Sequence, residues 1–138
     1  MIDFERYFLN EQQFFLNGVS YKTNQGIEQL SEYKLKCTDS ITVDLDIQNG
    51  IRIIFTRALN FEPEGLFVLE VSYGALLSFN PDTKNEVDWK HINLAEEVRN
   101  SEGFIMHNII SKVALLIAEI TAAGAQVPII TPPNMTRQ

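Results

Sequence analysis

The stretch from Phe104 to Ala123 restricts the possible folds of this chain more than any other part of the sequence. Its apolar residues recur at the i, i+3, i+4 and i+7 spacing of a helix, and further apolar residues widen the stripe that this spacing produces. A surface helix of a small domain needs a single apolar stripe. We therefore predict a helix over 104–123, ended by Gly124, that packs on a sheet with one side and on a second copy of the chain with another. The predicted interface between copies consists of Ile109, Val113, Leu116, Ile117 and Ile120.

Alternation of apolar and polar residues ahead of this helix predicts four strands of an antiparallel sheet. The strands cover residues 14–21, 33–47, 51–61 and 66–79, and the second is clearest over 41–47. Asn49-Gly50 predicts a tight hairpin turn with positive φ at both residues between the second and third strands. Gly74 predicts a bulge or bend. Arg57 interrupts the apolar face of the third strand, and nothing in the sequence explains it.

The remaining segments complete a single domain of 138 residues. Residues 1–13 are predicted to form an N-terminal helical segment, 14–79 the sheet, 93–124 two helices, and 125–138 an extended proline-rich tail. Asn93, with Glu96 three residues later, resembles a capping box that opens the first of these two helices. We expect the polar segment 80–92 to be a loop. The predicted class is α+β, a four-stranded antiparallel sheet with a long helix packed on one face.

Composition excludes several classes of function. The net charge of -7, the pI near 4.7 and the scattered placement of the 11 Lys and Arg residues argue against nucleic-acid binding. A single cysteine, Cys37, indicates a reducing compartment. The N-terminus lacks the residue order of a secretory leader, and the long helix carries Lys112 and Glu119. We therefore expect a cytoplasmic protein without membrane insertion.

Few residues suggest catalysis. Cys37 and His107 could in principle pair as nucleophile and base, but the local signals of a cysteine hydrolase are missing. The spacing of His, Cys and carboxylate residues suits no metal site. We predict no enzyme, no cofactor and no metal. Asp44, Asp46 and Glu70 alternate onto the sheet face opposite the core, which is either a solvated face or an acidic docking patch for a basic partner.

Two segments resemble the SecB family of protein-export chaperones. Residues 67–78 are similar to that family's fourth strand, with an apolar–Glu–Val start and a glycine before the end, and residues 128–135 are similar to the segment after its long helix. The order of strands, hairpin, linker and helix also fits over residues 14–135. The resemblance implies a Greek-key sheet, assembly into a homotetramer as a dimer of dimers, and an ATP-independent holdase that binds unfolded or precursor polypeptides in apolar grooves. The client-binding positions that it implies are Ile27, Leu30, Val43, Leu45 and Met135.

One departure from the family concerns its docking on the SecA motor, which uses acidic residues of the first and fourth strands. Glu70 matches the acid of the fourth strand, whereas Gly18 and Lys22 stand where the first strand would carry acids. This departure disfavours SecA as a partner. A SecB-like chaperone with a narrow client set, such as an antitoxin, fits the sequence better than a general factor in protein transport.

Two other classes of protein remain open. A hotdog-type ligand-binding protein or thioesterase also wraps a sheet around a long apolar helix, but there the helix precedes most of the strands, and here it follows all of them. A passive assembly or adaptor protein would offer its apolar surface only to its own copies. Binding of a dye to apolar patches on the native oligomer would separate that class from a holdase.

Overall fold

The computed structural model describes residues 2–23, 34–62, 67–101, 103–123 and 128–135. Four strands, β1 (Phe8–Thr23), β2 (Lys34–Asp46), β3 (Gly50–Glu62) and β4 (Phe67–Phe79), form one antiparallel sheet in the order β1-β4-β3-β2. Three sequential strands pair as neighbours and the first lies beside the last, which is a Greek key. The helices are α1 (Phe4–Tyr7), α2 (Leu94–Asn100) and α3 (Phe104–Ala123). The predicted α+β class is confirmed.

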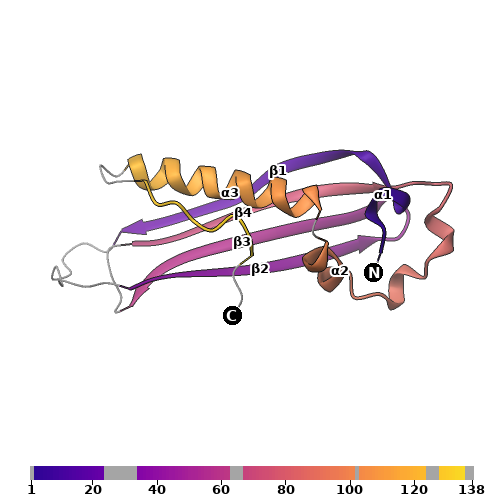
Figure 1. The fold of residues 1–138 in the computed structure, drawn as a ribbon, viewed down its shortest axis with the longest axis horizontal. Helices are drawn as coiled ribbons and strands as arrows, with labels where there is room; N and C mark the ends of the chain where they lie inside the picture. The colour runs from indigo at the N-terminus through magenta and orange to yellow at the C-terminus, as the bar shows by residue number, and fades with distance from the viewer. Residues whose placement is uncertain (1, 24–33, 63–66, 102, 124–127, 136–138) are drawn as a thin grey trace.

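Helix α3 runs along one face of the sheet (Figure 1) and has the predicted bounds. Its sheet-facing stripe contains Ile109, Val113 and Ile117, each 0% exposed. These three side chains have no surface left for a second copy, so their assignment to an interface between copies is wrong. The reason is that residues at i, i+4 and i+8 share one side of a helix, and the chain's own sheet covers that side. Leu116 and Ile120 are half-buried against the same core, and their place in an interface stays a prediction.

By length and hydropathy alone, residues Ile105–Ala123 could cross a membrane. In the fold, however, this segment is the helix that covers the sheet. A core helix of a globular domain passes the same test of length and hydropathy. Packing on the sheet accounts for the buried stripe of α3, which is 39% of this window.

The N-terminal segment differs from the prediction. Within the described residues 2–13, the helix covers only Phe4–Tyr7. It is capped by the Asp3 side chain, which accepts a hydrogen bond from the Glu5 amide. Strand β1 begins at Phe8, which pairs with Phe79 and is 3% exposed. The Phe8 ring centroid lies 5.3 Å from that of Phe79 and 5.5 Å from that of Trp89. This long-range aromatic packing outweighs the local i, i+4 pattern that predicted a helix over 1–13.

The β2–β3 hairpin also differs from the prediction. Asp46 pairs with Gly50, so the turn contains the three residues between them, and Gly50 is the first residue of β3 with φ 154°. A Cβ atom on Gly50 would lie 1.8 Å from the backbone oxygen of Leu77. Glycine is therefore needed here for close approach to β4 as well as for its positive φ.

Gly74 marks no bulge in the β3–β4 ladder, where Ile54 pairs with it in continuous register. A Cβ atom there would lie 2.5 Å from Phe15 Cζ and 2.7 Å from the backbone oxygen of Ile53. The glycine makes room for the Phe15 ring on the outer face of the sheet. The irregularities described in the β1–β4 ladder lie instead between Phe8 and Gln12 and between Leu16 and Gly18.

The segment after β4 is more ordered than the predicted loop, because it contains two short 3₁₀ helices, η1 (Lys84–Glu86) and η2 (Trp89–His91). Trp89 is 5% exposed, and its indole Nε1 donates a hydrogen bond to the Lys84 carbonyl at 2.8 Å. Helix α2 follows with Asn93 as its predicted cap, since the Asn93 side chain accepts from the Glu96 amide at 3.2 Å.

Candidate binding surface

Arg57 lies on the helix-facing side of β3 and is 0% exposed. Directly opposite it in the β2–β3 register is Asp39. The Arg57 Nε and Nη2 atoms donate to the two carboxylate oxygens of Asp39 at 2.7 and 2.8 Å. The pair is bidentate and fully enclosed, which is the strongest geometry for an ion pair between these residue types.

The other hydrogen bonds of Arg57 go to the tail, the described part of which is 128–135. Nη1 donates to Thr131 Oγ1 at 2.8 Å and to the Pro132 carbonyl at 2.7 Å, and Nη2 donates to the Asn134 carbonyl at 3.0 Å. A guanidinium has five N–H groups, so Asp39 and the tail together satisfy all of them. We call Asp39, Arg57 and Thr131, with these two carbonyls, the tail clamp.

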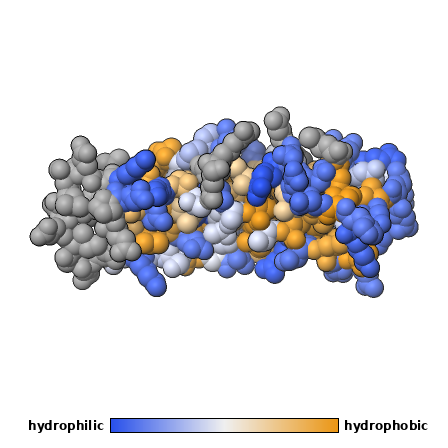
Figure 2. Space-filling model, turned by 90° about the horizontal axis from the view of Figure 1, so that it is seen from below, coloured by the Kyte–Doolittle hydropathy of each residue, from blue (hydrophilic) through white to orange (hydrophobic). Residues whose placement is uncertain are grey.

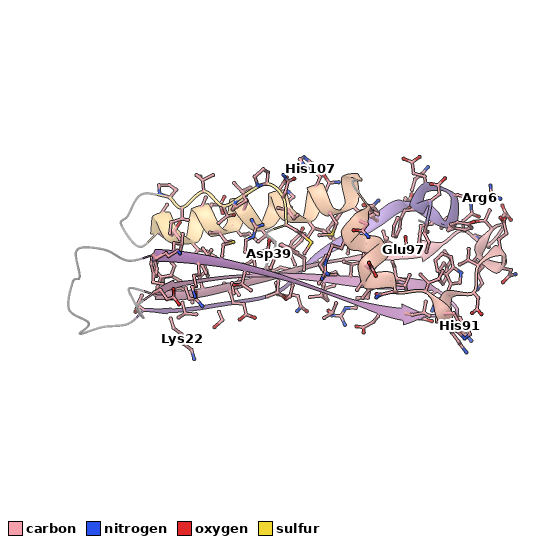
Figure 3. All side chains as sticks on the ribbon, turned by 60° about the horizontal axis from the view of Figure 1, so that its bottom comes forward. Arg6, Lys22, Asp39, His91, Glu97 and His107 are labelled. Atoms are coloured by element: carbon pink, nitrogen blue, oxygen red, sulfur yellow. The ribbon has the colours of Figure 1, made fainter. Side chains whose placement is uncertain are left out.

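A second anchor ties the tail to α3. The Thr121 hydroxyl donates to the Ile117 carbonyl at 2.8 Å and accepts from the Ile129 amide at 2.9 Å. The tail therefore follows α3 and then crosses β3 and β2 where Arg57 and Asp39 lie (Figure 1). Figure 3 shows Asp39 beside the tail, with Lys22 projecting from the opposite side of the sheet.

Edge strand β2 carries a row of apolar side chains on the same side of the sheet as the clamp. We define the β2-side surface by Leu35, Cys37, Val43 and Leu45 of β2 and Met135 of the tail. Leu35 is 39% exposed, and the other four are half-buried against the core. Viewed from the β2 edge, apolar side chains form patches separated by polar ones (Figure 2).

The structure thus places three of the five predicted client-binding residues, Val43, Leu45 and Met135, on this one surface. Ile27 and Leu30 lie outside the described residues. Helix α2 also packs on β2 and buries Val98 at 1% exposure. The surface is therefore bounded by α2 near the hairpin end of β2, and the tail crosses it at Asp39.

Cys37 lies on the β2-side surface next to the clamp. Burial raises the pKa of its thiol, the nearby Asp39 carboxylate raises it further, and the Arg57 guanidinium lowers it. A raised pKa reduces the thiolate fraction at neutral pH and makes the thiol a poor nucleophile. His107 projects outward from α3 (Figure 3), so it does not face Cys37 on the sheet. The geometry gives no support to a catalytic pair.

The predicted acidic patch is spread along the outer face of the sheet. Asp44, Asp46 and Glu70 are all exposed there. Asp44 pairs with Arg52 of β3 and Glu70 with Ala58, so the two carboxylates lie about 20 Å apart along the strands. Asp46 serves the hairpin turn, because its carboxylate accepts from Asn49 Nδ2 at 2.8 Å and from the Gln48 amide at 3.1 Å. Both hydrogen bonds lower the pKa of Asp46, and the bond from the Asn49 side chain has the larger effect.

A shallow depression of about 390 Å³ lies on this outer face, where β1 is irregular after Leu16. Five of its eight lining residues carry polar side chains, and Glu70 supplies the only carboxylate among them. The lining residues are Asn17, Gly18, Val19, Ser20, Ile54, Thr56, Glu70 and Ser72. Asn17 Nδ2 donates to Ser72 Oγ at 3.2 Å, and Ser72 Oγ lies 2.9 Å from Thr56 Oγ1. The Asn17 amide and the two hydroxyl groups therefore link β1, β4 and β3 by hydrogen bonds across this face.

Among the described residues, no three His, Cys, Asp or Glu side chains come together as a metal site would require. Neither Arg57 nor its tail contacts were recognised from sequence as part of a site. The one signal was a charged residue within an apolar strand face.

No protein-family model and no curated protein sequence matches the chain. A solved structure does match. It is the Mycobacterium tuberculosis Rv1957 SecB-like chaperone in complex with a ChAD peptide from the Rv1956 HigA1 antitoxin. The TM-score is 0.67 at 11% sequence identity, and the match covers 88% of this chain and 86% of the other. The chain therefore has the fold of a SecB-like chaperone.

Proposed function

We propose that this protein is an ATP-independent molecular chaperone, a holdase that binds extended segments of non-native polypeptides in the cytoplasm. The observation that carries the proposal is the β2-side surface on this fold. Leu35, Val43, Leu45 and Met135 offer apolar contact area along an edge strand, and an extended client buries alternate side chains against such a surface. The structural neighbour supports the proposal, because that SecB-like chaperone holds a peptide.

The client class that we propose is a dedicated polypeptide such as an antitoxin. The structural neighbour binds a peptide from an antitoxin. The outer sheet face argues in the same direction, since Lys22 and Gly18 flank Glu70 there in place of further acids. A basic side chain beside the Glu70 carboxylate weakens the acidic character that docking on an export motor would use.

We further propose that the working form is a homo-oligomer, a dimer of dimers in the arrangement that the resemblance implies. The support is apolar surface that the fold leaves uncovered away from β2. Leu115 on α3 is 54% exposed and Leu16 on β1 is 53% exposed. Phe14 and Val19 of β1, at 37% and 44%, extend this exposed set. Association of copies would remove such side chains from water.

The test of the proposed function is suppression of aggregation. The purified protein is mixed with a heat-treated or reduced client without nucleotide, and light scattering is followed over time. We expect scattering to fall as the chaperone approaches stoichiometry with the client. Unchanged scattering at a several-fold excess of chaperone would contradict the proposal. No observation on this structure favours the hotdog alternative, since α3 follows all four strands.

A further inference from the structure

We propose that Arg57 is a positioning residue for client binding, because it fixes the tail as one wall of the client site on the β2-side surface. This inference rests on the proposed function. Asp39, Arg57, Thr121 and Thr131 shape the site without touching a client that is bound on the β2-side surface.

The first step is that the described tail, residues 128–135, has no regular secondary structure that would fix its position. Pro128, Pro132 and Pro133 have no backbone N–H, and no residue of 128–135 is in a helix or strand. A segment without ladder hydrogen bonds depends on side-chain contacts for its place. The polar contacts that the structure shows for this segment are the bond from Ile129 to Thr121 and the bonds from Arg57.

The second step is that the clamp is prepared by the sheet. Asp39 and Arg57 face each other in the β2–β3 register, so the guanidinium plane is set by two strands before the tail contributes. The Arg57 N–H groups that do not bond Asp39 donate to three acceptors in one short stretch of the tail, at Thr131, Pro132 and Asn134. Because two of them are main-chain carbonyls, the clamp fixes the path of the backbone itself.

The third step connects this path to the client site. Met135 is the residue directly after the last clamped carbonyl, and it is half-buried against the core. Ile129, at the other anchor, is half-buried as well, whereas Ile130 between the anchors is 80% exposed. The clamp therefore decides which tail side chains face the sheet and where Met135 stands on the β2-side surface. A loosened tail would present Met135 as a mobile side chain, at an entropic cost to binding.

The test uses Thr131→Val, which removes one acceptor of Arg57 and nearly keeps the side-chain volume. The matched control is Thr42→Val, on the exposed outer side of β2. The full-length proteins are compared in amide exchange of the tail and in affinity for a fluorescently labelled, permanently unfolded client. We expect faster exchange over 128–135 and about a five- to thirty-fold weaker client affinity for Thr131→Val. The control should match the wild type in both measurements.

A double variant separates positioning from general loosening. If Thr131 acts through the wall that carries Met135, then Thr131→Val should weaken binding little further in a Met135→Ala background, because the two changes share one effect. Thr121→Val releases the other anchor and should reproduce the loss of affinity by an independent route. It also serves if Thr131→Val fails to fold.

Four results would overturn the inference. They are unchanged tail exchange in Thr131→Val, faster exchange with unchanged affinity, a gain in affinity, and additive losses in the double variant. A gain would mean that the tail competes with the client. Failure of the wild type to bind any unfolded client is a different result, since it would remove the proposed function while the exchange data still reported on the clamp.

Discussion

A guanidinium taken fully out of water loses its hydration, and the loss is recovered only when each N–H group finds an acceptor in good geometry. Arg57 meets this condition through Asp39 and the tail, at donor–acceptor distances of 2.7 to 3.0 Å. The arrangement is sensitive to removal of either partner, because the partner left behind would be a charge without solvent. We therefore expect the free energy of unfolding to depend strongly on the pair of Asp39 and Arg57.

We predict that Asp39→Ala destabilises the protein by about 3–5 kcal/mol, since it leaves the Arg57 charge buried with its two carboxylate acceptors gone. The measurement is chemical denaturation followed by circular dichroism. Asp44→Ala, an exposed carboxylate on the same strand, is the control and should change the free energy of unfolding by less than about 0.5 kcal/mol. Similar small losses in both variants would show that the pair is not what holds this region.

The role of Arg57 could not be read from the sequence, and the reason is one of distance and register. Three of its acceptors lie 74, 75 and 77 residues further along the chain. The predicted two-residue turn at Asn49-Gly50 would pair Gln48 with Ile51 and set Thr42 opposite Arg57. The observed turn is one residue longer and sets Asp39 there. Asp39 in place of Thr42 is a register shift of three residues, and a shift by any odd number of residues exchanges the two faces of a strand.

At the scale of elements, agreement with prediction follows the length and strength of the pattern. Helix α3 was predicted with correct bounds because 20 residues of periodic sequence leave little ambiguity. The four strands were predicted to exist, yet β1 is 16 residues long and starts at Phe8 rather than Phe14. Its first part pairs with the end of β4, a contact that no local pattern reports.

For the β2–β3 hairpin we predict that Gly50→Ala destabilises the protein by about 1–3 kcal/mol, because the side chain would meet the Leu77 backbone at a strained φ. Gly18→Ala is the matched control, since a Cβ atom there has nothing within 4 Å. It should be neutral or slightly stabilising. Thermal unfolding of both variants checks the prediction, and equal effects would contradict the close approach of β3 to β4.

At the scale of the whole molecule, the long apolar helix has a simpler explanation than the one predicted from sequence. Its strongest stripe is covered by the chain's own sheet, so the apolar character of α3 does not by itself require a second copy. The apolar surface that the fold leaves uncovered lies on the β2-side surface, on β1 and at Leu115 of α3, which is 54% exposed. Two of the predicted client residues, Ile27 and Leu30, lie outside the described residues. Val43, Leu45 and Met135 lie together on the β2-side surface, and their role in client binding stays a prediction.

Binding of non-native polypeptides by the β2-side surface can be tested with a pair of double variants. Val43→Ser/Leu45→Ser removes apolar area from that surface, while Val68→Ser/Leu76→Ser removes a similar amount from the outer face, where these residues are 45% and 39% exposed. Affinity for a labelled unfolded client is measured by fluorescence anisotropy without nucleotide. We expect at least about a tenfold loss of client affinity for the first variant and near wild-type affinity for the second. Equal affinities in the two variants, or a larger loss in the second, would contradict this expectation.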